Sequence, residues 1–411
     1  MKPGLALQGR ALLQARCAQL PTVLQQVLDE SEQRSAHGVP LRPDLAWAAG
    51  QPQVTQVVVT GIGASEGPAR LLVAQLRTEA KLDAQFVPLS QFAGAFLLPV
   101  QAVLVVFSQG LSPNARLALR QAPRGAATIL YTSVVPDAHA APGCTAGYLA
   151  RLQADGVLVA VLPPRCEDRL FLRVLGPAAA MLAGVQLAQV LARRLGSAMD
   201  AELQKLPERV GAAMVGVDEA VAVAGQQLAR CGVLPTAMER TWTLAALWQQ
   251  LPRLQLAFLT TEGLGELCLG LRWKLMEGTG QCDPPVWDVL QFVHGPLQLL
   301  YRRPALLCVL TGPQQAGQEE LLQRLAALLP AHHALVRLPA QLPTPLRLFE
   351  HDAQGNQLVL SALPQLESAQ AAQGAAEALW DLEDWPGKGQ DAALYGVHEP
   401  PAAADVQPPQ K

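Results

Sequence analysis

The stretch VVVTGIGASEGPARLLVAQL, residues 57–76, determines the expected fold. It begins with three valines, which predict a strand that is buried on both faces. Gly61 and Gly63 follow, and glycine permits the tight backbone turn that is needed where such a strand ends. The apolar spacing after Glu66 predicts an amphipathic helix. A strand that passes through glycines into a helix is the opening unit of a parallel α/β sheet.

The same alternation continues along the chain. In the first half, apolar runs at 103–107, 127–131 and 157–162 predict strands, and 170–195 predicts a long buried helix. The pattern restarts with LQLAFLTTEG, whose apolar strand again leads into a helix through a loop that contains glycine. Such internal similarity favours two units of similar plan. The sequence therefore predicts an α/β fold with two units, each a parallel sheet covered by helices on both faces.

Changes in composition divide the chain into five expected segments. Glycine and proline interrupt the pattern before the first strand, helical sequence of mixed polarity separates the two halves, and the end is rich in proline and alanine. The expected segments are an N-terminal helical arm (1–50), a first α/β unit (51–199), a helical connector (200–235), a second α/β unit (236–370) and a C-terminal helix with a disordered tail (371–411).

Composition excludes several classes of protein. Of the 411 residues, 50% are hydrophobic and 16% are charged, which is enough apolar material for large buried cores. The net charge is -3 and no run of lysine or arginine occurs, so we expect no nucleic-acid partner. The seven cysteines are scattered and form no C-x-x-C pair, which is the pattern of buried thiols in a reducing compartment. We expect a cytoplasmic protein with no metal and no cofactor.

Membrane insertion and secretion are also not expected. The N-terminal sequence has charges spread through it and lacks an apolar core of signal-peptide length. The most apolar segment, VLGPAAAMLAGVQLAQVLARRLG, is interrupted by Gln186 and Gln189. Its uninterrupted apolar length is shorter than a membrane span, so we interpret it as a buried helix.

Two loops are candidates for a ligand site. In open α/β sheets ligands bind beyond the carboxyl ends of the strands. Gly63 and Ser65 follow the first strand, and Ser108, Gln109 and Ser112 follow the strand at 103–107. Hydroxyls and backbone N–H groups at the start of a helix suit an anion such as a phosphate ester. The alternative is that these small residues only form tight turns, with Ser112 capping the following helix.

A cluster of ionisable residues lies in the second half. Lys274 and Glu277 are three residues apart and share a helix face, and His294 follows in a His-Gly-Pro turn. A carboxylate together with a neighbouring acid can move a proton from carbon and onto oxygen beside a carbonyl. The alternative is an exposed Lys-Glu pair and an unrelated loop histidine.

These motifs together resemble a known family. WKLMEGTG followed by VLQFVHGPLQLL resembles the second half of the sugar isomerase (SIS) family, which includes the isomerase portion of glucosamine-6-phosphate synthase. VVVTGIGASEGPARL is similar to the first strand and turn of that family, and LVVFSQGLSPNARLAL to its serine-rich phosphate loop. The resemblance extends over roughly residues 50–370. The glutaminase domain of the synthase has no counterpart here.

The resemblance implies two tandem units with about five parallel strands each, usually in a homodimer with a phosphosugar at the interface of the units. By motif match, Ser65, Ser108, Gln109 and Ser112 would bind the phosphate, beside the Gly63 turn. Glu277 would act on the proton of the sugar carbon, His294 would help to open the ring, and Lys274 would assist on the same face.

Two main hypotheses about function follow. The first is a sugar-phosphate isomerase or an amino-sugar deaminase or deglycase, in which Glu277 and His294 transfer protons. The second is a catalytically inactive sensor or regulator that binds a carbohydrate derivative, favoured by Gly110 and Leu111 in the serine loop and by Gln291 near the histidine. An inert dimeric scaffold is a third alternative. In the first two cases the expected ligand is a small sugar phosphate.

Overall fold

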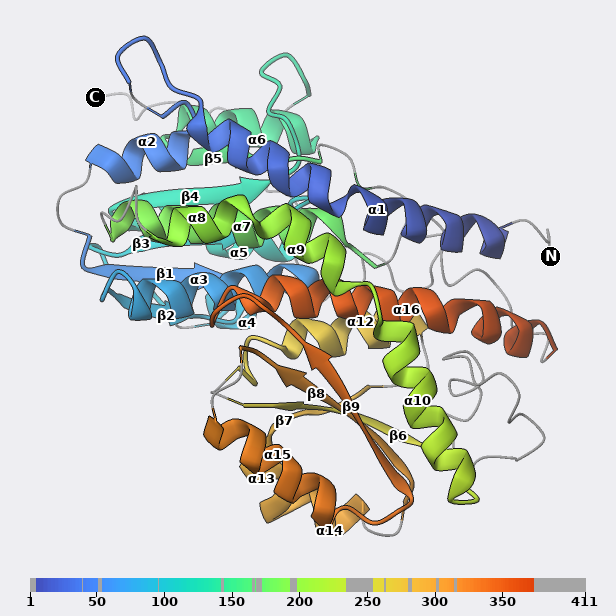
Figure 1. Cartoon of the computed structure of the whole chain (residues 1–411). Helices are drawn as coiled ribbons and strands as arrows, with labels where there is room; N and C mark the ends of the chain where they lie inside the picture. The colour runs from blue at the N-terminus through green and yellow to red at the C-terminus, as the bar shows by residue number, and fades with distance from the viewer. Residues whose placement is uncertain are drawn as a thin grey trace, which may run out of the picture.

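The computed structural model contains two parallel β-sheets, each covered by helices (Figure 1). The structure describes residues 5–372 except 39, 51–53, 95, 142–143, 165–166, 168–171, 193–197, 234–253, 262–263, 280–282, 301–302 and 314–315.

The first sheet has five parallel strands in the order β2-β1-β3-β4-β5. All of its neighbouring strands are parallel, and the valines of the opening stretch lie in β1, between β2 and β3. The strands are β1 (Gln56–Thr60), β2 (Asp83–Phe86), β3 (Val103–Phe107), β4 (Ala127–Thr132) and β5 (Leu158–Val161).

Alternate residues of these strands face two different layers of helices. Val57 and Val59 pack into a core with α3 and α7, whereas Val58 packs with α4, α5 and α6 on the opposite face. Burial on both faces explains the continuous apolar runs in the sequence. The helices are α3 (Glu66–Thr78), α4 (Leu89–Phe92), α5 (Pro113–Leu119), α6 (Thr145–Ala154) and α7 (Leu175–Leu191), with the short 3-10 turns η1 (Gly63–Ser65) and η2 (Ala122–Arg124).

The second sheet has four parallel strands among the described residues, in the order β7-β6-β8-β9. If the strands of each sheet are numbered along the chain, the second sheet has the order 2-1-3-4. The first four strands of the first sheet have the same order. The strands are β6 (Gln255–Thr260), β7 (Val286–Asp288), β8 (Ala305–Thr311) and β9 (His333–Pro339).

Helices cover both faces of the second sheet as well. Phe258 and Leu306 face α10, α12 and α16, while Leu259 and Leu307 face α13, α14 and α15. The helices are α10 (Val217–Arg230), α12 (Leu269–Thr279), α13 (Val289–His294), α14 (Pro296–Leu300), α15 (Ala316–Leu328) and α16 (Arg347–Ala372).

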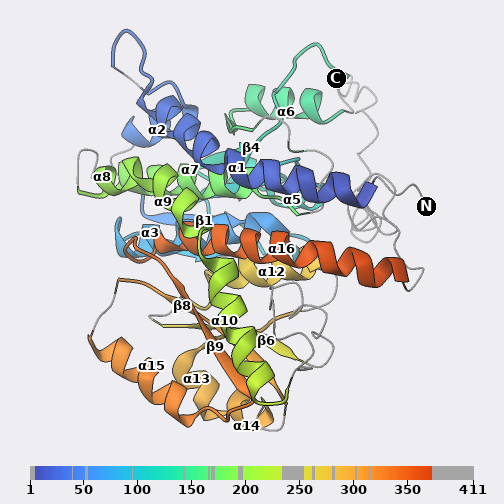
Figure 2. The same cartoon turned by 45° about the vertical axis from the view of Figure 1, so that its right-hand side comes forward.

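One hydrophobic core joins the two halves. It runs from the inner face of the first sheet, through α7, α12 and α16, to the inner face of the second sheet. Helix α1 packs on α7, α9 and α16 and so contacts elements of both halves (Figure 2). The remaining helices are α1 (Leu5–Glu32), α2 (Pro43–Gly50), α8 (Ala198–Gln204) and α9 (Leu206–Ala213).

The expected fold class is confirmed: parallel sheets with helices on both faces. The second sheet has four strands within the described residues where about five were expected. The long buried helix is α7, and within the described residues no helix combines the length and apolarity that crossing a bilayer requires. The expected tail, 371–411, lies outside the described residues except for the end of α16.

Candidate functional site

The turn after β1 has a shape that its glycines require. Gly63 has a φ of +57°, in the left-handed region where glycine is not strained. A Cβ on Gly61 would lie 2.4 Å from the carbonyl oxygen of Ser65, which is closer than any side chain tolerates. Glycine at these two positions therefore permits the tight η1 turn after β1. The turn brings Ser65 to the N-cap position of α3.

The loop after β3 is closed by its own hydroxyl group. The Oγ of Ser108 accepts a hydrogen bond from the backbone N–H of Ser112 at 3.1 Å. Ser112 precedes α5 at the N-cap position, but its side chain makes no capping hydrogen bond in this structure. The expected position of Ser112 is thus confirmed, whereas the interaction expected of a capping serine is not found.

These two loops meet at the carboxyl edge of the first sheet, the edge where its strands end. Ser65, Ser108 and Gln109 line one small cavity there, together with Thr132 and Ser133 at the end of β4. Gly63 and Ser112 lie in the same loops but not on the cavity wall. The free space is about 10 Å³, which is about enough for one water molecule.

Glu167 fills the position where an anion would bind. Its carboxylate accepts hydrogen bonds from the backbone N–H groups of Val174, Leu175 and Gly176, at 2.6, 2.8 and 2.8 Å. The amide of Gln109 donates a fourth, at 2.9 Å. The first free N–H groups of a helix form a natural anion site, and here the anion at α7 is a side chain of the same protein.

Gly176 makes this arrangement possible. A Cβ at Gly176 would lie 2.2 Å from the side-chain amide of Gln109. The lack of a side chain at the start of α7 therefore leaves the space that Gln109 uses to reach Glu167.

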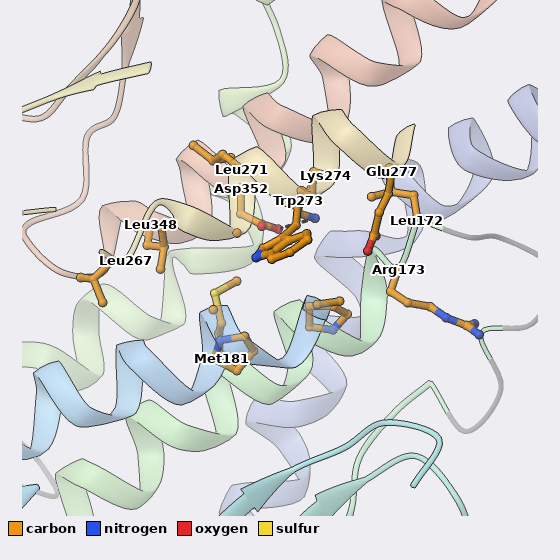
Figure 3. Close-up of a pocket in the computed structure, with 15 residues that line it drawn as sticks. Leu172, Arg173, Met181, Leu267, Leu271, Trp273, Lys274, Glu277, Leu348 and Asp352 are labelled. Carbon is orange, nitrogen blue, oxygen red and sulfur yellow. Dashed lines mark ion pairs between the residues drawn. The ribbon is translucent and has the colours of Figure 1, made fainter. Parts of the chain in front are cut away.

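A second cavity lies between the two halves of the chain (Figure 3). Its free space is about 20 Å³, and the Trp273 ring and Met181 occupy the middle of the view in Figure 3. Helices α3 and α7 form one wall and α12 and α16 the other. Lys274 and Glu277 both line it, as their shared helix face predicted.

Lys274 is held by α16. Its Nζ lies 2.7 Å from Oδ1 of Asn356, to which it donates, and 3.1 Å from Oδ2 of Asp352. Only 6% of Lys274 is exposed. Burial raises the pKa of Asp352, and the ammonium of Lys274 opposes that rise. The alternative of an exposed Lys274–Glu277 pair is not what the structure shows, because the ammonium binds Asn356 and Asp352 in the interior.

Glu277 has the environment of a proton-transfer group. Burial raises the pKa of its carboxyl to about 7, and the positive charges of Lys274 and Arg173 only partly oppose this. Figure 3 shows the carboxylate of Glu277 directed toward the base of the Arg173 side chain, whose guanidinium extends away from the cavity. A carboxyl with a pKa near neutrality can both accept and release a proton at physiological pH.

His294 lies apart from Glu277 within one chain. Glu277 is on α12 and His294 is the last residue of α13, and these helices cover opposite faces of the second sheet (Figure 1). His294 is exposed. The structure therefore brings Glu277 and Lys274 together and leaves His294 outside their cavity.

The two cavities are neighbours. Pro177, in the first turn of α7, lines both of them, and Ala64 and Ser65 of η1 line one each. The serines at the sheet edge and the carboxyl of Glu277 thus lie on two sides of the same helical turn. Among the described residues, no group of histidine, cysteine and acidic side chains is placed to hold a metal ion.

Sequence reasoning missed Glu167, Asp352 and Asn356. One local signal for Glu167 was present: an acidic residue between the last strand of the first sheet and the glycine-proline start of the long helix. No local signal marked Asp352 or Asn356, because their partner Lys274 is about 80 residues away in sequence and only packing brings them together.

Sequence comparison finds no relative of this chain: no protein-family model matches it, and no curated protein matches it. Comparison of structures does find a shared fold. The C-terminal domain of glucosamine-fructose-6-phosphate aminotransferase from Francisella tularensis superposes with a TM-score of 0.58 at 11% identity, covering 86% of this chain and 95% of that one.

Two further solved structures are similar to the same extent. Glucosamine-6-phosphate deaminase from Thermotoga maritima has a TM-score of 0.59 at 14% identity, over 87% of this chain and 95% of its own. Tagatose-6-phosphate ketose/aldose isomerase from Escherichia coli has a TM-score of 0.58 at 14% identity, over 86% and 92%. At such low identity the similarity establishes the fold and leaves the chemistry to the site.

Proposed function

We propose that this protein is a sugar-phosphate isomerase, or an amino-sugar deaminase or deglycase, that transfers a proton at a sugar carbon through Glu277. The observation that carries the proposal is the position of Glu277: a half-buried carboxyl with a pKa of about 7, in a cavity between the two halves. Perturbed carboxyl groups of this kind are concentrated at catalytic sites. The three solved structures described above, all named for sugar phosphates, support the substrate class.

The phosphate group is assigned to the neighbouring cavity. Ser65, Ser108 and Gln109 supply hydroxyl and amide groups there, and Gly63 and Ser112 belong to the loops that hold them. A sugar phosphate would extend from these groups past Pro177 toward Glu277, since that residue separates the two cavities. A ligand of this size needs several hundred cubic ångströms, so side chains such as Trp273 must move to admit it. The carboxylate of Glu167 must also leave the N–H groups at the start of α7 if the phosphate is to bind them.

The role of His294 requires a second copy of the chain. Within one chain the second sheet separates it from Glu277. We therefore assign the ring-opening acid to His294 of the partner subunit in a homodimer. Lys274 is assigned a positioning role, because its ammonium holds α12 against α16 and its charge acts on the carboxyl of Glu277.

The two sheets are proposed to be tandem SIS units in a cytoplasmic protein, with 51–199 as the first and 236–370 as the second. The arm at 1–50, the connector at 200–235 and the segment 371–411 complete the division. The shared strand order of the two sheets supports a common plan for the units.

The test is an assay of purified protein on fructose 6-phosphate, tagatose 6-phosphate and glucosamine 6-phosphate. Glu277→Gln should lower turnover by about a thousandfold on whichever of the three compounds the wild type converts. The variant should still bind that compound. Glu208→Gln, on an exposed acid of α9, is the matched control and should leave turnover unchanged. Full activity of Glu277→Gln would disprove the assignment.

Mixing two inactive variants tests the partner's histidine. If the site is shared, refolding Glu277→Gln together with His294→Ala produces mixed dimers in which one of the two sites has both wild-type residues. Activity should then recover to a fraction of the wild-type value. Absence of any recovery, with mixed dimers verified by mass spectrometry, would show that His294 of the partner subunit does not complete the site of Glu277.

A second candidate function is a non-catalytic sensor for a carbohydrate derivative. The observation that favours it is Glu167, whose carboxylate already occupies the anion position at the start of α7. The sensor would bind a sugar phosphate without turnover. Thermal shifts with the same three compounds, followed by the assay on each that binds, distinguish the two candidates.

A further inference from the structure

A much larger cavity lies at the carboxyl edge of the second sheet, away from the residues discussed so far. Its volume is about 450 Å³, which falls within the range of pockets that hold small molecules. Thr311 at the end of β8 and Pro339 at the end of β9 form its base. The turn between α9 and α10 and the first turns of α16 form its sides.

Its location is where ligands bind in folds of this type. Parallel strands present the free ends of their loops and the starts of their helices at this edge. The corresponding edge of the first sheet is filled by Glu167 and Gln109. At the second edge the acid on the wall, Glu350, is held by backbone N–H groups of the loop after β9, and the space beside it stays open.

The charges around this cavity favour an anion. Oε2 of Glu350 accepts hydrogen bonds from the backbone N–H groups of Gln341 and Leu342, at 2.8 and 2.7 Å. Burial raises the pKa of the Glu350 carboxyl, and these N–H groups and the charge of Arg209 only partly oppose that rise. Two arginines, Arg209 and Arg337, also line the cavity. Arginine binds carboxylate and phosphate groups through its fixed fork of N–H donors.

Arg337 is already oriented for this purpose. Its Nη1 and Nη2 donate to the two carboxylate oxygens of Glu319 at 2.7 and 3.1 Å, and its Nε takes no part in that pair. Arg209 is exposed on α9 and forms no ion pair with another of the described residues, so its side chain is available to reach a ligand. The cavity is thus lined by Arg337, whose guanidinium is fixed by Glu319, and by Arg209, whose side chain can change its conformation.

Part of the remaining wall consists of small apolar side chains. Val217, Ala220 and Leu338 line the cavity beside the arginines. Such a surface suits an uncharged body attached to the anionic group, since burying it costs no hydrogen bond.

We propose that this cavity is a second binding site, for a small molecule with one phosphate or carboxylate group and an uncharged body. Arg209 and Arg337 bind the anionic group, and the wall around Ala220 contacts the body. The site is independent of Glu277 and of the serine loops, and it does not depend on the function proposed above.

Isothermal titration calorimetry at constant ionic strength tests the proposal with four probes: inorganic phosphate, glucose 6-phosphate, AMP and citrate. At least one should bind saturably with a Kd below about 1 mM, and comparison of the probes shows whether phosphate or carboxylate is preferred. Arg209→Gln and Arg337→Gln should each weaken binding by about tenfold, since each removes a charge-assisted hydrogen bond.

Three further variants locate the site. Glu319→Gln breaks the same ion pair as Arg337→Gln but keeps the guanidinium, so it should not weaken binding. Ala220→Phe should abolish binding by filling the cavity. Gln109→Ala alters the first sheet's cavity and should leave intact the binding event that Ala220→Phe removes.

The proposal is overturned if none of the four probes binds more tightly than about 10 mM. It is equally overturned if the probe that binds is insensitive to both arginine variants, or if Gln109→Ala abolishes its binding. Two binding events per chain, of which Ala220→Phe removes one, would support it.

Discussion

The carboxyl edges of the two sheets have the same strand order but opposite contents. At the first, Glu167 and Gln109 fill the space, and about 10 Å³ remains. At the second, about 450 Å³ is open, and two arginines line it. Corresponding edges of two parallel sheets can therefore differ: one is filled and stabilises the protein, and the other leaves open space.

This difference between the two edges predicts how the removal of charged groups affects stability. Charged groups at the filled edge and between the halves are buried and bonded, so their removal should cost stability. The two arginines at the open edge are exposed or only partly buried, so their removal should affect binding more than stability.

The largest loss of stability is expected for Lys274→Met, in the cavity between the two halves of the chain. The change leaves Asp352 buried without its counter-ion, and it should lower the free energy of unfolding by about 4 kcal/mol. Urea denaturation measures it. Lys205→Met removes an exposed lysine that pairs with Glu202 and should have almost no effect. Equal losses from the two variants would contradict the structural role of Lys274.

The next effect is that of Glu167→Ala at the filled edge. Three backbone N–H groups and the amide of Gln109 lose their acceptor, which should cost about 3 kcal/mol of unfolding free energy. Inorganic phosphate should restore part of the loss by occupying the vacated position. Glu219→Ala, on an exposed acid in the first turn of α10, is the control. A loss below about 1 kcal/mol would show that this carboxylate is not what closes the first edge.

A smaller effect, of opposite sign, is expected for Glu277→Gln. Its carboxyl has a pKa of about 7 in the folded protein against an ordinary value of 4.5. Below pH 4.5 both states are protonated, so the group has no effect. As the pH rises toward 7 the unfolded chain releases the proton that the folded chain keeps, and stability falls.

The glutamine variant does not titrate, so it should be more stable than the wild type by about 2 kcal/mol near pH 8 and equal to it near pH 4. Urea titrations at the two pH values measure the difference. Glu208→Gln, which makes the same chemical change on an exposed residue, should show no such pH dependence. A constant difference between Glu277→Gln and the wild type at both pH values would mean that the pKa of Glu277 is not raised.

The smallest effect on stability is expected at the open edge. Arg209→Gln should change the free energy of unfolding by less than about 0.5 kcal/mol, because the side chain is exposed. Thermal and urea unfolding without added anions measure it. A larger loss would mean that Arg209, like Glu167, serves the fold.

Much of the fold could be predicted from the sequence because it depends on local patterns. Apolar runs such as 103–107 mark strands that are covered on both faces, and the glycines at 61 and 63 mark the turn. The strand count of the second unit was less accessible, since the number of strands that pair depends on neighbours that are distant in the chain.

The candidate site was only partly predictable. The spacing of Lys274 and Glu277 correctly placed both on one wall, because helix geometry alone determines it. The spacing could not show that Lys274 is neutralised by Asp352, or that a sheet lies between Glu277 and His294. It also could not show which of the two sheet edges is open.

By itself, the sequence determined the parallel α/β class, the positions of the main strands, the turn after β1 and the shared face of Lys274 and Glu277. These features depend on backbone geometry and on which residues a local segment must bury. Only the tertiary structure decided that Glu167 occupies the start of α7 beside Gln109, 58 residues away, and that the second edge stays open. Such contacts depend on which helices pack together, and that is a property of the whole chain.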